Sequence, residues 1–315
     1  MAHITGLHHV TAIAADPQAN LDFYSGTLGM RLVKKTVNQD VPDTYHLFYA
    51  DAEGHPGTDL TFFPWPEMAP GVKGAGLASE VGLAVPSGSL GYWSERLARA
   101  GVPGVREEVR FGERSLVFAD PHGLDLALVE TDDEREFSPW EQGPVPSIHQ
   151  VRGLHSVRLW QRQLGPTARF LDVLGFARRG EEDGWHRFTP GTGGSGTIVD
   201  VREVPSVQRG SWGPGVVHHV AWRVPNDRAE LAARAEVAGA GAHPTEVIDR
   251  FWFRSVYFRE PGGVLFEIAT DGPGFAVDEP TESLGERLVL PPWFESARAK
   301  IEQGLQPLHA PAALP

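Results

Sequence analysis

One stretch near the N-terminus, Gly6-Leu7-His8-His9-Val10-Thr11-Ala12-Ile13-Ala14-Ala15-Asp16, returns altered in the last third of the chain as Val217-His218-His219-Val220-Ala221-Trp222-Arg223-Val224-Pro225-Asn226. Each copy is apolar and β-branched, as strands are, and ends in a residue that can cap a following helix. Each also carries a His-His pair near its start. Because side chains alternate along a strand, we expect the two imidazoles of a pair to point to opposite faces. The repetition indicates that one histidine from each copy binds a shared metal ion.

The composition limits both the class of protein and the kind of metal site. The 315 residues carry a formal charge of −13, which disfavours binding to nucleic acid and to anionic membranes because phosphate groups would be repelled. The chain has no cysteine, so a metal must bind histidine, aspartate or glutamate. It shows neither a long apolar run nor a signal-peptide pattern, and we expect a cytoplasmic protein.

The segments around the two stretches repeat as modules of one strand, one helix and three further strands. In the first module the helix begins after Asp16-Pro17 and is ended by Gly29. The second module has the same order, with the turn Asp120-Pro121-His122-Gly123 before its last strand. The expected strands of these two modules are residues 7–15, 30–37, 45–50, 59–63, 80–85, 107–111, 115–119 and 124–130, and the second helix spans residues 87–100.

Two more modules follow an acidic, proline-containing linker at residues 131–147. The third opens with Gly153-Leu154-His155-Ser156-Val157, which echoes residues 6–10, and its helical segment is expected to end near Phe176. The fourth opens at Val216. The further strands expected here are residues 185–188, 197–204, 245–249, 253–258 and 264–270, with helices at residues 227–240 and 294–303.

The pattern predicts an α+β fold of four βαβββ modules in two halves, with mixed sheets curled into half-barrels. The N-terminal half spans residues 1–135 and the C-terminal half residues 150–275. Residues 276–315 form a C-terminal tail.

Comparison of the modules with one another identifies candidate metal ligands. The second histidine of each pair is His9 in the first module and His219 in the fourth, where the other two modules have Glu80 and Ser156. In the last strand of the fourth module the fourth residue after Gly263 is Glu267, and the same count in the second module reaches Ala127. A carboxylate inside an apolar strand is costly unless it is paired or binds a cation. Two imidazoles and one carboxylate form the facial triad of non-haem Fe(II) oxygenases, which leaves coordination positions open.

The remaining histidines have less specific interpretations. A single histidine on a strand is more often a core residue than a ligand, and we assign His46, His155 and His243 to that class. His8 and His218 either pack on the face opposite the ligands or lean toward a substrate, and spacing alone favours neither. If His9 is a ligand together with His219, the first and last modules must meet in space.

The modules, the duplicated His-His pairs and the terminal glutamate resemble the vicinal oxygen chelate superfamily. Within it, the chain resembles ring-cleaving dioxygenases of the hydroquinone and chlorohydroquinone dioxygenase type. The segments that carry this resemblance are Ile4-Thr5-Gly6-Leu7-His8-His9-Val10-Thr11, Tyr45-His46-Leu47-Phe48-Tyr49-Ala50-Asp51, Gly54-His55-Pro56-Gly57-Thr58, Leu265-Phe266-Glu267-Ile268-Ala269-Thr270 and Leu290-Pro291-Pro292-Trp293.

The resemblance implies an Fe(II) enzyme that opens a dihydroxylated aromatic ring with O2, the substrate being a hydroquinone or a catechol. Mn(II) or Zn(II) would also fit the site in a purified sample. The ligand trio of the family falls on His9, His219 and Glu267, and further site residues fall on His8, Thr11, His218, Arg250 and Tyr257. The other interpretation of Arg250 is a turn arginine in a salt bridge, and that of Tyr257 is a core tyrosine. The sequence leaves the oligomeric state open, and a homo-oligomer is one of the alternatives.

Two alternatives remain at this point. A glyoxalase-like lyase or isomerase of the same superfamily usually has an additional carboxylate ligand, which Glu80 could supply. A metal-free ligand-binding protein of the same fold is the second alternative, although it would not need Glu267 inside an apolar strand.

Overall fold

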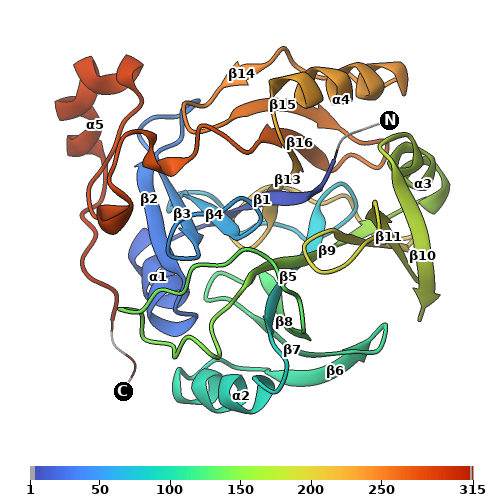
Figure 1. The fold of residues 1–315 in the computed structure, drawn as a ribbon, viewed down its shortest axis with the longest axis horizontal. Helices are drawn as coiled ribbons and strands as arrows, with labels where there is room; N and C mark the ends of the chain where they lie inside the picture. Colours follow the sequence, from blue (N-terminus) through green and yellow to red (C-terminus); the bar gives the residue numbers. More distant parts are fainter. Residues whose placement is uncertain (1–3, 313, 315) are drawn as a thin grey trace.

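The computed structural model describes residues 4–312 and 314 and contains the four predicted modules (Figure 1). The first helix begins at Pro17, where the Asp16 side chain accepts a hydrogen bond from the amide of Ala19 at 2.7 Å, and it continues as a π-helical segment. The elements of the first two modules are β1 (Gly6–Ala14), α1 (Pro17–Leu21), η1 (Asp22–Thr27), β2 (Arg31–Val37), β3 (Tyr45–Ala50), β4 (Asp59–Pro64), β5 (Ala78–Pro86), α2 (Leu90–Arg99), β6 (Arg106–Arg110), β7 (Glu113–Ala119) and β8 (Asp125–Thr131).

The other two modules follow the same order and lead into the tail. Their elements are β9 (Gly153–Gln161), α3 (Leu164–Val173), β10 (Phe176–Glu182), β11 (Trp185–Pro190), β12 (Ile198–Glu203), β13 (Val217–Val224), α4 (Asp227–Gly239), β14 (Ile248–Asp249), β15 (Arg254–Arg259) and β16 (Leu265–Thr270). The tail contains η2 (Phe275–Val277), η3 (Thr281–Ser283), η4 (Pro292–Ala297) and α5 (Arg298–Gly304). The expectation that the third helical segment reaches Phe176 is wrong, because the chain turns at Gly175 with a positive φ and Phe176 begins β10.

The strands form two eight-stranded mixed sheets, and each sheet combines one module from each half of the sequence. One sheet has the order β14-β15-β16-β13-β1-β4-β3-β2 and unites the first and fourth modules. The other has the order β10-β11-β12-β9-β5-β8-β7-β6 and unites the second and third. The α+β fold with two curled half-barrels is therefore confirmed, and so is the expectation that the first and last modules meet.

Main-chain irregularities occur at the same place in both sheets. Where β1 pairs with β13, the register runs from Leu7 to His9 without His8 and passes over His218 on the other strand. Where β5 pairs with β9, the register passes over Ser79 and His155 in the same way. Each module thus has a β-bulge near the start of its first strand, which changes the direction of the side chain there.

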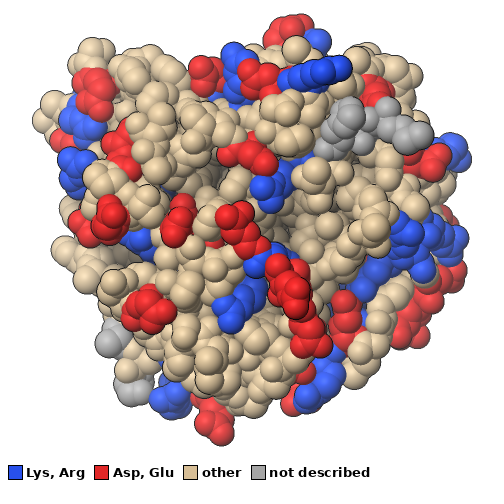
Figure 2. All heavy atoms as spheres, in the orientation of Figure 1, with Lys and Arg blue, Asp and Glu red and all other residues tan. Residues whose placement is uncertain are grey.

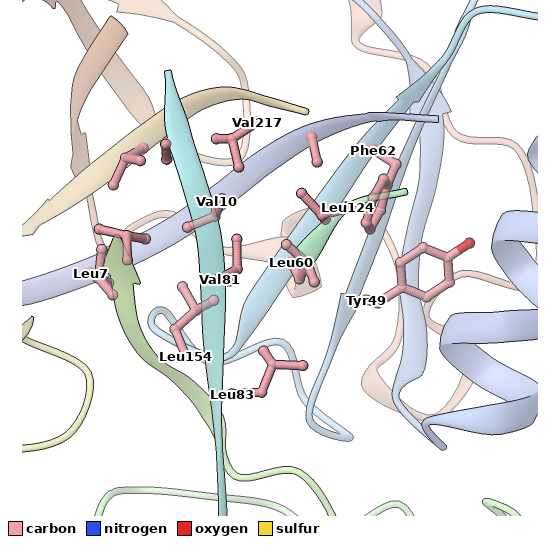
Figure 3. Packing of buried hydrophobic residues seen from close by; sticks show 14 of the residues in the cluster. Leu7, Val10, Tyr49, Leu60, Phe62, Val81, Leu83, Leu124, Leu154 and Val217 are labelled. Atoms are coloured by element: carbon pink, nitrogen blue, oxygen red, sulfur yellow. The ribbon is translucent and has the colours of Figure 1, made fainter. Parts of the chain in front are cut away.

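The main core lies between the two sheets and under the peripheral helices. Figure 3 shows Leu7 and Val10 from β1 near Val81 and Leu83 from β5, all of them part of one buried cluster. A smaller apolar cluster lies on the other face of the first sheet, toward the tail. The residues of that smaller cluster are Val33, Phe48, Ala50, Ala221, Trp252, Phe253, Ala269, Phe275 and Leu284.

The C-terminal tail runs along β2 and then past α1 (Figure 1). Lys34 on β2 is fully buried, and its ammonium group contacts the carboxylate of Glu279, lies 2.9 Å from Asp278 Oδ1 and donates to the carbonyl of Phe275. The same ammonium lies 5.3 Å from the ring of Trp252. This ion cluster ties the tail to the loop before β15.

The surface shows no single concentration of charge on the face drawn in Figure 2, where acidic and basic side chains are interspersed with broad uncharged areas. Among the described residues, no helix combines the length and the apolar character that a bilayer crossing requires.

Candidate metal centre

Three potential ligand atoms converge on the concave face of the first sheet. His9 lies on β1, His219 on β13 and Glu267 on β16, and all three side chains are buried. Glu267 Oε2 lies 3.2 Å from His9 Nε2 and 2.9 Å from His219 Nε2. Within the part of the chain that the structure describes, these residues are the one set of metal-ligating side chains whose ligand atoms all lie within 4.8 Å of one another.

The two carboxylate oxygens of Glu267 have different surroundings. Ser255 on β15 donates its hydroxyl to Oε1. The buried Oε2 has no hydrogen-bond donor, because its short approaches to the two imidazoles lack hydrogen-bond geometry. Burial would raise the pKa of Glu267, but the two imidazoles beside it hold that pKa well below the usual range. An ionised carboxylate with one oxygen held and the other free fits a monodentate metal ligand.

Both histidines of each pair point to the same face. The sequence-based expectation of opposite faces is wrong, because His8 and His218 are the bulged residues and strand alternation is interrupted there. The ring centroids of His8 and His9 are 5.1 Å apart, and those of His218 and His219 are also 5.1 Å apart, with an interplanar angle of 81° in both pairs. The bulges therefore let the two pairs lie side by side, with the ring centroids of His9 and His219 5.3 Å apart.

The hydrogen bonds of His8 determine the tautomer of His9. His8 Nε2 lies 3.1 Å from the carbonyl oxygen of Thr270, which can only accept, so Nε2 carries the proton. Burial, with a contribution from His9, lowers the pKa of His8 to about 3, so the ring is neutral and its Nδ1 is an acceptor. His9 Nδ1 lies 2.9 Å away and must donate, which leaves the lone pair of His9 Nε2 directed at Glu267.

The second pair allows the same arrangement. His219 Nδ1 and His218 Nδ1 are 2.8 Å apart, and burial lowers the pKa of both rings. When His219 donates from Nδ1, its Nε2 is free to bind a metal, and the proton of neutral His218 is on Nε2. The hydroxyl of Thr11 lies 3.0 Å from His219 Nε2 and 2.7 Å from the hydroxyl of Thr61. In this arrangement two nitrogen lone pairs and one carboxylate oxygen are directed at a common centre, as metal binding requires.

Replacing His8 is expected to weaken metal binding although His8 is not a ligand. His8→Leu removes the acceptor of the His9 Nδ1 proton, and loss of such a partner typically lowers metal affinity by roughly 10- to 100-fold. His8→Asn can restore part of the affinity, because its Oδ1 can accept that proton. Competition with a chelator, using Zn(II) as the probe, measures the change. Ser79→Ala, at the equivalent bulge of the other sheet, is the matched control, and affinity of His8→Leu equal to that of the unaltered protein would contradict the assignment.

A cavity of about 890 Å³ adjoins the centre, and two of the three ligands, His9 and His219, line it. His218, Arg250 and Tyr257 line it together with His9 and His219, whereas His8 is behind His9. The Arg250 guanidinium lies 5.3 Å from the ring of Tyr257 and pairs with Asp40 at 2.9 Å. Burial, helped by the charge of Glu267, raises the pKa of Tyr257, so the phenol keeps its proton. Proton donors and one fixed cation therefore surround the open side of the centre.

Three residues near the centre were not identified from the sequence. His46, assigned above to the core, lines the cavity, and its Nε2 lies 2.9 Å from the hydroxyl of Thr61. Ser255 shares a face of β15 with Tyr257, so strand alternation could have found it. Trp212, whose ring stacks on His218 at 4.2 Å, comes from an irregular linker that has no sequence signal.

Acid is expected to destabilise the metal-free protein partly through His46. Burial between Phe48 and Phe63, with contributions from His9 and His219, lowers the pKa of His46 well below 6.5. Below pH 6.5 the unfolded chain then binds a proton that the folded chain does not, so the free energy of unfolding falls by at most about 1.4 kcal/mol per pH unit.

His46→Phe should remove this contribution to the slope between pH 6 and pH 4 in urea titrations. Phe48→Leu is the control, since it lowers stability without removing a titrating group and should keep the slope. An unchanged slope in His46→Phe would show that His46 does not resist protonation.

The second sheet has no metal centre at the equivalent place, and ion pairs occupy it instead. Glu80, at the position of His9, forms a bidentate ion pair with Arg110, whose two guanidinium nitrogens lie 2.5 and 3.1 Å from the carboxylate oxygens. Asp200 accepts one from Arg187, and Arg158 lies 3.7 Å from each of these carboxylates. The strand pairing also places Ala127 where the first sheet has Glu267. Glu80 is therefore not available as a fourth ligand of the centre on the first sheet.

Comparison with known proteins agrees with this architecture. The family model described as Glyoxalase/Bleomycin resistance protein/Dioxygenase superfamily matches residues 6–128 and 153–268. The chain is 44% identical over 303 residues, 96% of each chain, to the "Putative ring-cleaving dioxygenase MhqO" of Bacillus subtilis (strain 168). It is 34% identical over 313 residues, 95% of each chain, to the "Chlorohydroquinone/hydroquinone 1,2-dioxygenase" of Sphingobium indicum.

A solved structure shares the whole fold. The crystal structure of a "putative dioxygenase" from Bacillus subtilis superposes with a TM-score of 0.94 at 43% identity and covers 98% of this chain and 99% of that one. Glyoxalase I from Zea mays, at 14% identity and a TM-score of 0.62, shares the fold alone. The repeated modules, the paired sheets and these matches together show that the chain belongs to the glyoxalase/bleomycin resistance protein/dioxygenase superfamily, in which its close homologues carry the name of ring-cleaving dioxygenases.

Proposed function

We propose that this protein is a non-haem Fe(II) dioxygenase that cleaves an aromatic diol with O2, a hydroquinone being favoured over a catechol. The metal would be held by His9, His219 and Glu267. The observation that carries the proposal is the convergence of two imidazole Nε2 atoms with a carboxylate oxygen that has no donor, beside a cavity whose lining includes several aromatic side chains. The chemistry that Fe(II) supplies when bound is redox activation of O2 next to an electron-rich ring. The name of the Sphingobium indicum homologue supports a para-diol.

The residues around the cavity have roles that suit this reaction. His218 would hold a substrate or product oxygen through its Nε2 proton, and Tyr257 would donate its phenolic proton to developing negative charge. Arg250 would favour the phenolate form of a bound diol through its charge. His8 would act as a positioning residue for His9, because both of its nitrogens are already bonded within the protein.

A glyoxalase-like lyase or isomerase is the less favoured candidate. The strand pairing that places Glu267 opposite Ala221 in the fourth module places Thr61 opposite Thr11 in the first. A second carboxylate at this equivalent position would provide the additional ligand, and the chain has a threonine there. The open positions of the centre therefore suit a substrate and O2 better than a four-ligand site does.

The decisive experiment is oxygen consumption by anaerobically reconstituted protein. After loading with Fe(II) and removal of excess metal, addition of hydroquinone or catechol with O2 should consume O2 and yield a ring-opened acid detectable by mass spectrometry. Zn(II)-loaded protein serves as the control and should be inactive. Turnover by the zinc form without O2 would favour an isomerase or lyase. Absence of O2 consumption with para- and ortho-diols alike would reject the dioxygenase. A cytoplasmic location fits these substrates and stays a prediction.

A further inference from the structure

The cavity beside the metal centre is larger than a single diol ring needs. Its volume of about 890 Å³ is that of pockets which enclose drug-sized ligands, whereas hydroquinone is one substituted benzene ring. The proposed ligands His9 and His219 are buried at the inner end. Exposed apolar side chains occur toward the solvent, among them Val41, Met68 and Trp212. The space between centre and solvent is therefore available to a substituent on the ring.

Two linkers between modules build the outer wall, and we call residues 65–76 and 205–216 the rim segments. Backbone hydrogen bonds join them, from the amide of Val72 to the carbonyl of Ser211 and from the amide of Ala75 to the carbonyl of Gln208. The two chains approach so closely that a Cβ at Gly213 would lie 2.2 Å from the carbonyl oxygen of Ala69. This contact needs glycine, and it makes the wall a fixed part of the structure.

Aromatic and apolar side chains of the rim segments face the cavity. Trp65, Met68 and Trp212 line it, and Trp212 is held between His218 on one side and the Arg259 guanidinium at 5.3 Å. Met68 remains 39% exposed and Trp212 36% exposed. Exposed apolar residues gathered at the mouth of a pocket mark a ligand-binding surface. Since a bound apolar group would cover them, this wall suits an apolar substituent.

The charges around the cavity disfavour an anionic substituent. Arg250 is the only lysine or arginine among the lining residues, and its charge is paired with Asp40. Asp43 and Glu67 add negative charge to the same lining. Arg259 lies on the other side of the Trp212 ring and outside this lining, so a carboxylate on the substrate would meet negative charge and no unpaired lysine or arginine among the lining residues.

We propose that the natural substrate is an uncharged para-diol whose ring carries a bulky apolar substituent, and that this substituent lies against Trp65, Met68 and Trp212. The inference rests on the proposed function for the diol chemistry. The preference for a bulky apolar substituent rests on the shape and lining of the cavity alone.

The test compares three para-diols: hydroquinone, phenylhydroquinone and 2,5-dihydroxybenzoate. Anaerobic calorimetry with Zn(II)-loaded protein measures binding, and O2 consumption by Fe(II)-loaded protein gives kcat/KM. We expect phenylhydroquinone to exceed hydroquinone by about 10-fold or more in both measurements, and 2,5-dihydroxybenzoate to bind more weakly than either. Equal affinities of phenylhydroquinone and hydroquinone, or tightest binding of 2,5-dihydroxybenzoate, would overturn the proposal.

Variants assign the preference to the rim segments. Met68→Ala and Trp212→Leu should each reduce the ratio of phenylhydroquinone to hydroquinone affinity several-fold. Val109→Ala, an exposed apolar position on β6 in the other sheet, is the matched control and should keep the ratio. If both rim variants keep it as well, the substituent does not lie on this wall. Failure of all diols to consume O2 would reject the proposed function, while the calorimetric ratio would still decide the substrate preference.

Discussion

Glu267→Gln is expected to abolish metal binding at stoichiometric concentrations and, with it, oxygen consumption. The amide is nearly the same size as the carboxylate, so the buried site keeps its shape. It removes the negative charge that offsets a divalent cation, and an amide oxygen is a much weaker ligand. Loss of a hydrogen-bond partner of a ligand alone lowers metal affinity by roughly 10- to 100-fold, so loss of a ligand should lower it by at least about 100-fold. Elemental analysis after anaerobic reconstitution measures the metal content, and oxygen consumption measures turnover.

Asp200→Asn provides a matched control for the Glu267 variant. Asp200 is equally buried and occupies the corresponding place in the third module, opposite Arg158 on the neighbouring strand. Its loss leaves Arg187 without a bidentate partner and should lower the melting temperature, yet metal content should stay at one ion per chain. If Glu267→Gln retains metal to the same extent as Asp200→Asn, Glu267 is not a ligand.

Glu279→Gln should produce a large loss of stability without touching the metal centre. The Lys34 ammonium and the Glu279 carboxylate contact each other at a fully buried site. Removing one member of such a pair leaves the other charge buried, which typically costs about 3–5 kcal/mol. Asp278, 2.9 Å from the ammonium and partly exposed, offsets some of this cost, so we expect about 3 kcal/mol in urea unfolding.

A double variant separates the pair from its surroundings. Lys34→Met combined with Glu279→Gln removes the unpaired charge and should recover part of the stability that Glu279→Gln loses. Glu295→Gln, which breaks an exposed ion pair with Arg298 in the same tail, is the control and should change stability by less than about 1 kcal/mol. Equal effects of Glu279→Gln and Glu295→Gln would show that the buried pair does not anchor the tail.

Much of the candidate site could be predicted because the four modules can be compared with one another. Each module shows which residue the others have at an equivalent position, so His9, His219 and Glu267 stood out against Glu80 and Ser156. The structure brings those three side chains together at hydrogen-bonding distances. The pairing of the first module with the fourth followed from the same idea, since two ligands on distant strands require adjacent strands.

Other features depend on tertiary structure that no local pattern contains. A bulge is a mismatch between two strands, so the common direction of His8 and His9 could not be inferred from alternation within one strand. His46 faces the cavity because β3 lies two strands away from β1 in the sheet. Trp212 and the buried Lys34 owe their roles to linkers and to the tail, whose paths are determined by what they pack against.

The order of strands in the two sheets has a consequence for synthesis on the ribosome. β5 and β9 pair across a short span of chain, whereas Gly6 on β1 pairs with Arg223 on β13. The sheet of the second and third modules can therefore close first, while β1 waits with an unpaired edge until the fourth module emerges. During that interval the nascent chain exposes a strand edge that is prone to aggregation. Only a nearly complete chain can then bring the two histidine pairs together, so the candidate metal site can form only late in synthesis.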